Sequence, residues 1–241
     1  MILGIDTATR TVAIGIAVGA RPIADAHLEG TGLRTRALLG GIEDLLHDAG
    51  ARADDLKGVA VGVGPGSFTG LRVGIAAAQG IALGLGVPVV GVGTLECVAR
   101  NAPPDADRIS VLVDAGRGEV FLGVFASRAD AIVALAPVEV LSPGRAAEAI
   151  PPGTTVLGDG WLRYRGAFER LLGAGIRTLD ENLSRPRGAV VAALGMLALS
   201  SAARGGQGTV ERGGFGAPGG VVGEHAAADD TCGEARAPGV R

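Results

Sequence analysis

A glycine-rich turn at residues 64–70, Gly-Pro-Gly-Ser-Phe-Thr-Gly, is the string best suited to chemistry. It stands between an apolar run that predicts a buried strand and a segment that predicts a helix. Glycines allow a ligand to approach the backbone, and the free N–H groups at a helix start favour an anion. We therefore expect a phosphate contact at Gly64, Gly66, Ser67 and Thr69. The alternative is a tight turn, capped by Ser67 or Thr69, that contacts no ligand.

Two well-known loop types do not fit this turn. No Gly-Lys-Ser or Gly-Lys-Thr ends it, as one would in a nucleotide-binding Walker loop. Ser67 also lacks the Gly-x-Ser-x-Gly frame of a nucleophile elbow. The residues of the turn therefore point to binding rather than to nucleophilic catalysis.

Asp6 and Thr7 end the first apolar run and complete the expected phosphate-binding set. In actin-like and sugar-kinase-like ATPases, an acidic residue in such a place serves the magnesium–phosphate site. A lone aspartate at a strand end is more often a turn former. The sequence offers no obvious second carboxylate to share a metal, so both interpretations of Asp6 stay open.

The remaining reactive side chains are scattered. A polar turn at residues 114–119 contains Arg117 and Glu119, which we interpret first as a surface ion pair. The histidines and cysteines have neither zinc-ligand spacing nor the number needed for a disulfide framework. We expect no metal site and no catalytic residue. The histidines and cysteines are His27, His47, His225, Cys97 and Cys232.

The charge balance argues against a polyanion-binding protein, and the hydropathy pattern argues against a membrane-spanning one. The chain has 22 basic and 25 acidic residues, whereas a surface that captures a polyanion needs a basic excess. Residues 73–95 carry no charge over a length that could cross a bilayer. However, glycines, Gln79 and Pro88 divide that segment into a helix and a strand, and the N-terminal run predicts a strand rather than a signal peptide. We expect a cytoplasmic protein without a membrane span.

Periodicity predicts an α/β chain with two lobes. The first lobe (1–103) and a smaller second lobe (104–187) meet at a Pro/Asp linker near 101–107. The helix at 188–203 is a candidate to pack back on the first lobe, and the glycine-rich tail at 205–241 has too little core material to be ordered. The expected strands are 2–6, 11–18, 22–28, 58–64, 88–92, a hairpin at 109–126, about 132–139 and 154–157. The expected helices are 33–49, 71–85, 94–99, one that opens at 142–143, 161–173 and 188–203.

Three strings together resemble one family: ILGIDTAT at the start, VAVGVGPGSFTGLRVGIAAAQGIALGLGVPVVGVGTLE in the middle, and VDAGRGEVF after the linker. They are similar to the TsaB (formerly YeaZ) family of bacterial tRNA threonylcarbamoyladenosine biosynthesis proteins, also called glycoprotease-like. The similarity covers about residues 1–200. Arg34 and Gly40 depart from the family pattern of the first helix, and the glycine-rich tail replaces its usual C-terminal segment.

The resemblance implies a two-lobed actin-like ATPase (ribonuclease-H-like) fold and a non-catalytic scaffold subunit. Its implied partners are the transferase TsaD, which modifies tRNA, the ATPase subunit TsaE, and a second copy of the chain when alone. Contact with tRNA would be indirect, through the complex. No cofactor is implied, and ATP or ADP would bind only at the complex interface. TsaD holds a metal through an HxxxH motif after its own GPG-type turn, and the matching residues here, 92–99, include no histidine.

The helix at 71–85 predicts the partner surface, because a helix that is apolar all round must be covered on both sides. The first helix, with its glycine pair, can add a flat face beside it, and in the family the corresponding helices make the subunit contact. The alternative is that both sides pack within one chain. The predicted interface residues are Leu38, Gly40, Gly41, Leu45, Gly74, Ala77, Ala78 and Ile81.

A rival function comes from a different class of protein. Asp6, Thr7 and the turn at 64–70 could serve an actin-fold phosphotransferase or hydrolase that acts on a small molecule or nucleotide. The missing metal ligands and the missing second acidic motif count against this function. Metal content and ATP turnover of the purified chain distinguish the two.

Overall fold

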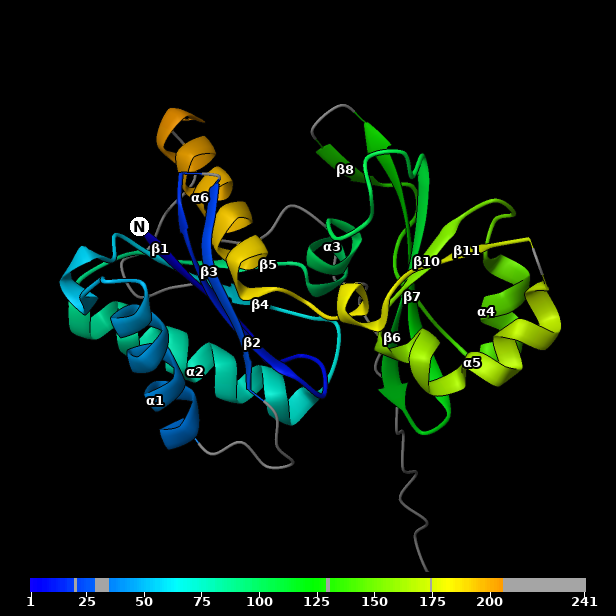
Figure 1. The fold of residues 1–241 in the computed structure, drawn as a ribbon, viewed down its shortest axis with the longest axis horizontal. Coiled ribbons are helices and arrows are strands. Elements are labelled where there is room, and N and C mark those ends of the chain that lie inside the picture. Colours follow the sequence, from blue (N-terminus) through cyan, green and yellow to red (C-terminus); the bar gives the residue numbers. More distant parts are fainter. Residues whose placement is uncertain (20, 29–34, 129–130, 174, 206–241) are drawn as a thin grey trace, which may run out of the picture.

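The computed structural model of the chain describes residues 1–19, 21–28, 35–128, 131–173 and 175–205. Two sheets stand beside each other, each with helices on its faces (Figure 1). The chain crosses from the first sheet to the second between residues 99 and 108, and it returns to the first sheet before residue 188. The predictions for Arg34 and for the tail beyond Gly205 lie outside the described residues.

The first sheet has the strand order β3-β2-β1-β4-β5. β1 lies at its centre, antiparallel to β2 and parallel to β4. All five strands predicted for the first lobe are present, β1 to β3 as an antiparallel meander and β4 and β5 parallel to β1. The bounds are β1 (Ile2–Asp6), β2 (Val12–Val18), β3 (Arg21–Leu28), β4 (Val59–Gly62) and β5 (Val89–Val92).

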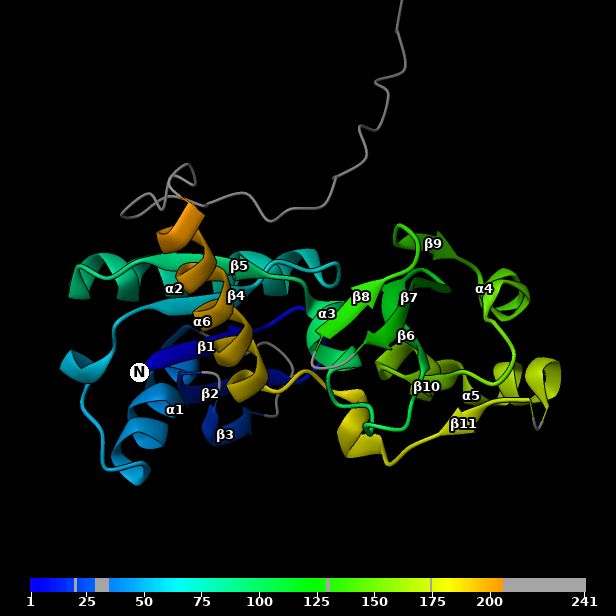
Figure 2. The same cartoon turned by 90° about the horizontal axis from the view of Figure 1, so that it is seen from above.

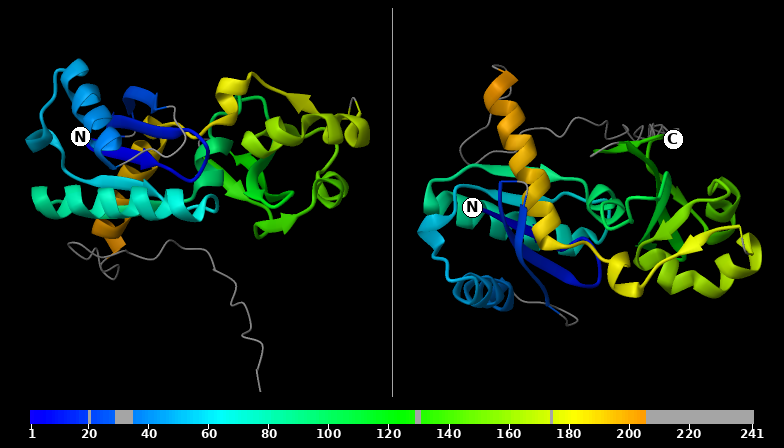
Figure 3. Two further views of the ribbon diagram at one scale, coloured as in Figure 1. Left: turned by 90° about the horizontal axis from the view of Figure 1, so that it is seen from below. Right: turned by 45° about the horizontal axis from the view of Figure 1, so that its top comes forward.

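Helices cover both faces of the first sheet (Figures 1 and 3). Successive residues of a strand point to opposite faces, so Leu3 and Ile5 pack against α1 (Thr35–Asp48) and α2 (Phe68–Leu85). Ile2 faces the other way, where α6 (Gly188–Gly205) crosses the sheet. α6 thus completes the core of the first lobe.

Glycines bring the backbone of α6 directly onto β1 and β2. Gly4 and Gly15 are paired across the two strands. A Cβ at Gly15 would collide with the backbone of Ala189, and one at Gly4 with the backbone of Gly188. The start of α6 is also fixed by Asp25, which accepts a hydrogen bond from the Ala189 N–H at 3.0 Å. Main chain rather than side chain therefore sets the distance between helix and sheet.

The second sheet has the order β11-β10-β6-β7-β8, and β9 pairs with β7. α4 (Pro143–Ala149) and α5 (Asp159–Leu172) pack on one face, and α3 (Thr94–Ala99) packs on the other. α3 lies between the two sheets, as Figure 2 shows from above. The strand bounds are β6 (Arg108–Gly116), β7 (Glu119–Arg128), β8 (Ala131–Ala134), β9 (Glu139–Leu141), β10 (Thr155–Leu157) and β11 (Arg177–Thr178).

The structure differs from the sequence-based expectations in several places. The strand predicted at about 132–139 is two short strands, β8 and β9. α2 begins three residues earlier than predicted because the Ser67 side chain caps it. β11 and the short 3-10 turns at Ala53–Asp55 and Glu181–Ser184 were not predicted.

The glycine pair in α1, Gly40 and Gly41, meets no other backbone within the described part of the chain. A Cβ at Gly41 would meet only the side chain of Leu28, and nothing lies within 4 Å of one at Gly40.

Replacing Gly15 by alanine tests the packing of α6. No side-chain rotation can relieve a collision with the Ala189 backbone, so we expect the free energy of unfolding to fall by about 1–3 kcal/mol. Gly166→Ala in α5 is the matched control, because nothing lies within 4 Å of its Cβ position. Its stability should be unchanged or higher by up to about 1 kcal/mol. Urea unfolding measures both variants, and equal stabilities would contradict the close packing.

Candidate functional site

Asp6 lies fully buried at the carboxyl end of β1. Its Oδ1 accepts a hydrogen bond from the Ala8 N–H at 2.9 Å, and its Oδ2 accepts one from the Thr94 hydroxyl at 2.7 Å. Burial raises the pKa of Asp6 to about 6. The two hydrogen bonds act in the opposite direction and lower this pKa, whereas the charge of Asp159 adds slightly to the rise. Both carboxyl oxygens thus bind groups of the protein itself and join β1 to α3.

Thr7 is also turned inward, with 3% of its surface exposed. Its hydroxyl donates a hydrogen bond to the Gly70 carbonyl at 2.8 Å. A Cβ at Gly74 would collide with this hydroxyl. Gly74 is therefore needed to make room for Thr7, and the Thr7 hydroxyl fixes the first turn of α2.

The turn at residues 64–70 packs against the chain's own backbone. The Ser67 N–H donates to the Ala8 carbonyl at 2.7 Å, and the Ser67 hydroxyl accepts from the Gly70 N–H at 3.2 Å. A Cβ at Gly66 would collide with the carbonyl of Ala8, and one at Gly70 with that of Thr7. The close approach that these glycines permit is therefore made by the turn after β1.

Five of the six predicted phosphate contacts meet in this packed junction: Asp6, Thr7, Gly64, Gly66 and Ser67. Gly64 joins it through its carbonyl, which accepts from the Thr94 N–H at 2.9 Å. Thr69, the sixth, is exposed on the first turn of α2. The geometry favours the capped turn over the phosphate site, which stays a prediction.

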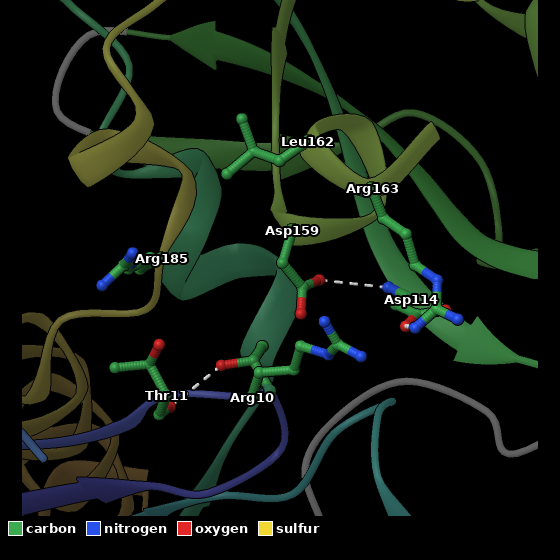
Figure 4. Close-up of a pocket in the computed structure, with 8 residues that line it drawn as sticks. Arg10, Thr11, Asp114, Asp159, Leu162, Arg163 and Arg185 are labelled. Atoms are coloured by element: carbon green, nitrogen blue, oxygen red, sulfur yellow. Dashed lines mark hydrogen bonds and ion pairs between the residues drawn. The ribbon is translucent and has the colours of Figure 1, made fainter. Parts of the chain in front are cut away.

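A cavity between the two lobes was missed by sequence reasoning. It has a volume of about 280 Å³, and Figure 4 shows the side chains that surround it. Two of the residues that line it belong to motifs singled out from the sequence: Thr9 ends the string ILGIDTAT, and Asp114 begins the polar turn at 114–119. The cavity is lined by Thr9, Arg10, Thr11, Asp114, Asp159, Leu162, Arg163 and Arg185.

The two aspartates of the cavity are held by the protein. Asp114 accepts from the Gly116 N–H at 3.0 Å and from the Arg163 guanidinium at 2.7 Å. Asp159 accepts a hydrogen bond from the Asp114 N–H at 3.0 Å. Burial raises the pKa of Asp159. The hydrogen bond from the Asp114 N–H lowers this pKa, and the negative charge of Asp114 raises it. Asp159 thus joins β6 to the start of α5.

The predicted partner surface needs correction. Side chains on the inner faces of α1 and α2 belong to the core. The sequence could not tell which face of α2 is covered, because that helix is apolar all round. Gly40, Gly41 and Ile81 keep part of their surface exposed. The buried members of the set are Leu38, Leu45, Gly74, Ala77 and Ala78.

The outer face of α2 is the one left uncovered. Ala76 and Gly80 are exposed, and 77% of the surface of Leu83 is exposed. At the start of the helix, Arg72 lies over the exposed Phe68 ring, 3.9 Å from its centre. By length and composition alone α2 could span a membrane, but its inner face packs on the first sheet. Among the described residues, no group of three or more His, Cys, Asp or Glu is placed to hold a metal.

Asp6→Asn tests the buried carboxyl by removing its charge while keeping its shape. Because the folded pKa, about 6, exceeds the ordinary value of 3.8, the folded state takes up a proton before the unfolded state does, and wild-type stability rises as pH falls. Relative to wild type, the variant should therefore lose about 1 kcal/mol between pH 7 and pH 5. Urea unfolding at both pH values measures this, with Asp54→Asn, an exposed carboxyl, as the control. A pH-independent difference between wild type and Asp6→Asn would contradict the raised pKa.

Comparison with known proteins agrees with this architecture. The family model described as TsaD: tRNA N6-adenosine threonylcarbamoyltransferase matches residues 34–163. The solved structure of YeaZ from Pseudomonas aeruginosa superposes with a TM-score of 0.70 at 27% identity, over 83% of this chain and 92% of that chain. This likeness confirms the expected α/β, two-lobed actin-like fold.

Two curated relatives bear the same name. The tRNA threonylcarbamoyladenosine biosynthesis protein TsaB of Escherichia coli (strain K12) is 41% identical over 50% of this chain and 52% of its own. TsaB of Bacillus subtilis (strain 168) is 32% identical over 52% of this chain and 54% of its own. The chain thus spans about half the length of the curated relatives it matches. Because the family model covers more than half of the chain, the chain belongs to the TsaD family, in which its named relatives are the TsaB (YeaZ) proteins.

Proposed function

We propose that the chain is a non-catalytic subunit in the synthesis of tRNA N6-threonylcarbamoyladenosine, and that it binds and supports a TsaD-type transferase. The names of its relatives support this pathway. The observation that carries the binding role is the uncovered outer face of α2. Its side chains resemble those of a core helix, yet nothing in the described part of the chain packs on them.

The outer face of α2 suits another helix as its occupant. Nothing lies within 4 Å of a Cβ at Gly80 or Gly84, so the backbone of a second helix can come close to this side. α1 lies on the same side of the first sheet (Figure 3) and adds Leu39, of which 39% is exposed. Burial of exposed apolar surface is the main source of association free energy. We assign the partner contact to the outer faces of α1 and α2.

The geometry around Asp6 supports a binding role over the rival phosphotransferase or hydrolase. A phosphoryl-transfer site needs carboxylates that face a metal and backbone N–H groups that face phosphates. Here Asp6 binds Ala8 and Thr94, and the Ser67 N–H binds Ala8. Those groups are already used inside the first lobe.

The other partners follow from the same assignment. We propose TsaE as a further subunit of the complex, a homodimer through the α1–α2 face when the chain is alone, and contact with tRNA only through the complex. The net charge of −3 supports indirect contact, since the chain has no basic excess. We also propose that the chain works in the cytoplasm, without a cofactor of its own, and that ATP or ADP binds only at the complex interface.

Leu83→Arg tests the partner face. A charge in an apolar interface loses its hydration without gaining a partner, so we expect binding of TsaD to weaken about tenfold or more and the homodimer to dissociate. Leu171→Arg on α5 is the matched control, because 59% of this leucine is exposed on the other lobe. Co-purification with TsaD from the same source and solution mass measure both effects. If folded Leu83→Arg still dimerises and retains TsaD, the assignment is wrong.

A further inference from the structure

The outer strand of the second sheet presents an exposed apolar edge. β8 ends that sheet, and within the described part of the chain no strand lies beyond it (Figure 1). Residues 131–141 read Ala-Ile-Val-Ala-Leu-Ala-Pro-Val-Glu-Val-Leu, with Glu139 as their one charged residue. Val133 is 43% exposed and Leu135 is 48% exposed. An exposed apolar strand at a sheet edge marks a surface that pairs with another chain.

Two other edge strands of the described part are protected against such pairing. β3, at the edge of the first sheet, carries Arg21, Pro22 and Asp25 within eight residues. β11, at the far edge of the second sheet, carries Arg177, which forms an ion pair with Asp105. Charges and proline on an edge strand oppose its pairing with another chain. β8 contains neither a charge nor a proline, so its edge is open to pairing.

The hydrogen bonds between β7 and β8 determine which backbone groups of β8 point outward. The Leu135 N–H donates to the Val124 carbonyl at 2.8 Å. Residues that bond to the neighbouring strand alternate with residues that do not in an antiparallel pair, so Val133 also bonds to β7. The N–H and C=O groups of Ile132 and Ala134 therefore point away from β7. They form a short outward row of donors and acceptors.

We propose that β8 pairs with β8 of a second copy of the chain, antiparallel about a two-fold axis. One register lets the outward groups of both residues in each copy form hydrogen bonds: Ile132 lies opposite Ala134 of the second copy. Val133 then lies opposite Val133 of that copy, and Ala131 lies opposite Leu135. Each pair joins a small side chain to a larger one or two of middle size, so the edge is complementary to itself.

The lack of charge on this edge favours a second copy as its occupant. A face that meets its own copy across a two-fold axis also meets its own charges, and like charges directly opposite each other destabilise a strand pair. β8 brings no such charges together. A contact between two four-residue strands is small, so we expect weak association that depends on concentration. It lies on the second lobe and does not depend on the proposed role with TsaD.

Disulfide formation by Val133→Cys tests the pairing and its register. Its two copies would face each other in a non-hydrogen-bonded pair, with Cα atoms about 4.5 Å apart, which is within disulfide reach. The full chain should carry Cys232→Ser, so that buried Cys97 is the one native cysteine left. Under a mild oxidant we expect a covalent dimer from Val133→Cys. Leu135→Cys on the same edge and Ile23→Cys on β3 are the controls, since both side chains are similarly exposed and neither would face its own copy. Equal cross-linking of all three variants, or none by Val133→Cys, overturns the proposal.

Val133→Lys tests the contact without a covalent bond. Two lysines would face each other at the axis, so self-association through β8 should weaken about tenfold or more. In the Leu83→Arg chain, sedimentation equilibrium should show a weak dimer at high concentration that Val133→Lys removes and the control Ile23→Lys retains. This arm separates the proposal from the partner face, because the weak dimer needs no contact through α2. If Val133→Lys and Ile23→Lys, both folded by thermal melting, associate equally at every concentration, the β8 contact is wrong.

Discussion

Direct packing of main chain on main chain around β1 determines how the first lobe is built. On one side Gly4 and its neighbour Gly15 admit the backbone of α6, and at the end of the strand Gly66 and Gly70 admit the turn that follows Asp6. Aromatic residues make up only 3% of the chain, so bulky side chains fill few of the gaps between elements. Close backbone approach takes their place, and it ties the centre of the sheet to α2 and α6, which are far apart in the sequence.

The same constraint decides which surfaces remain for function. The glycine-rich turn at 64–70 resembles a phosphate-binding loop in sequence, yet its neighbours are Thr7 and Ala8 rather than open space. The Asp6 carboxyl, which catalysis at this place would need, already accepts hydrogen bonds from Ala8 and Thr94. What stays open is the outer face of α2 and the arginine-lined cavity between the lobes. We propose that the first binds another protein.

Local patterns sufficed to predict most of the fold. Alternating apolar runs identify the meander and the β6–β7 hairpin, and the family strings predict the two lobes, because both signals lie within short stretches of chain. The two-residue strand β11 is too short to leave such a signal. The covered face of α2 could not be predicted, since all its faces are apolar. The cavity could not be predicted from the sequence either, because Arg10 and Arg163 are brought together only by the packing of two lobes.

The most direct test is whether Asp6 performs chemistry or only holds the first lobe together. ATP hydrolysis by the purified chain, alone and with TsaD, should be measured for wild type and for Asp6→Asn. Because both oxygens of Asp6 bind the protein itself, we expect the chain alone to hydrolyse ATP at the background rate in both forms, and TsaD to leave the two forms equal. Hydrolysis by the wild-type chain that Asp6→Asn abolishes would show that Asp6 is catalytic and would contradict the structural role.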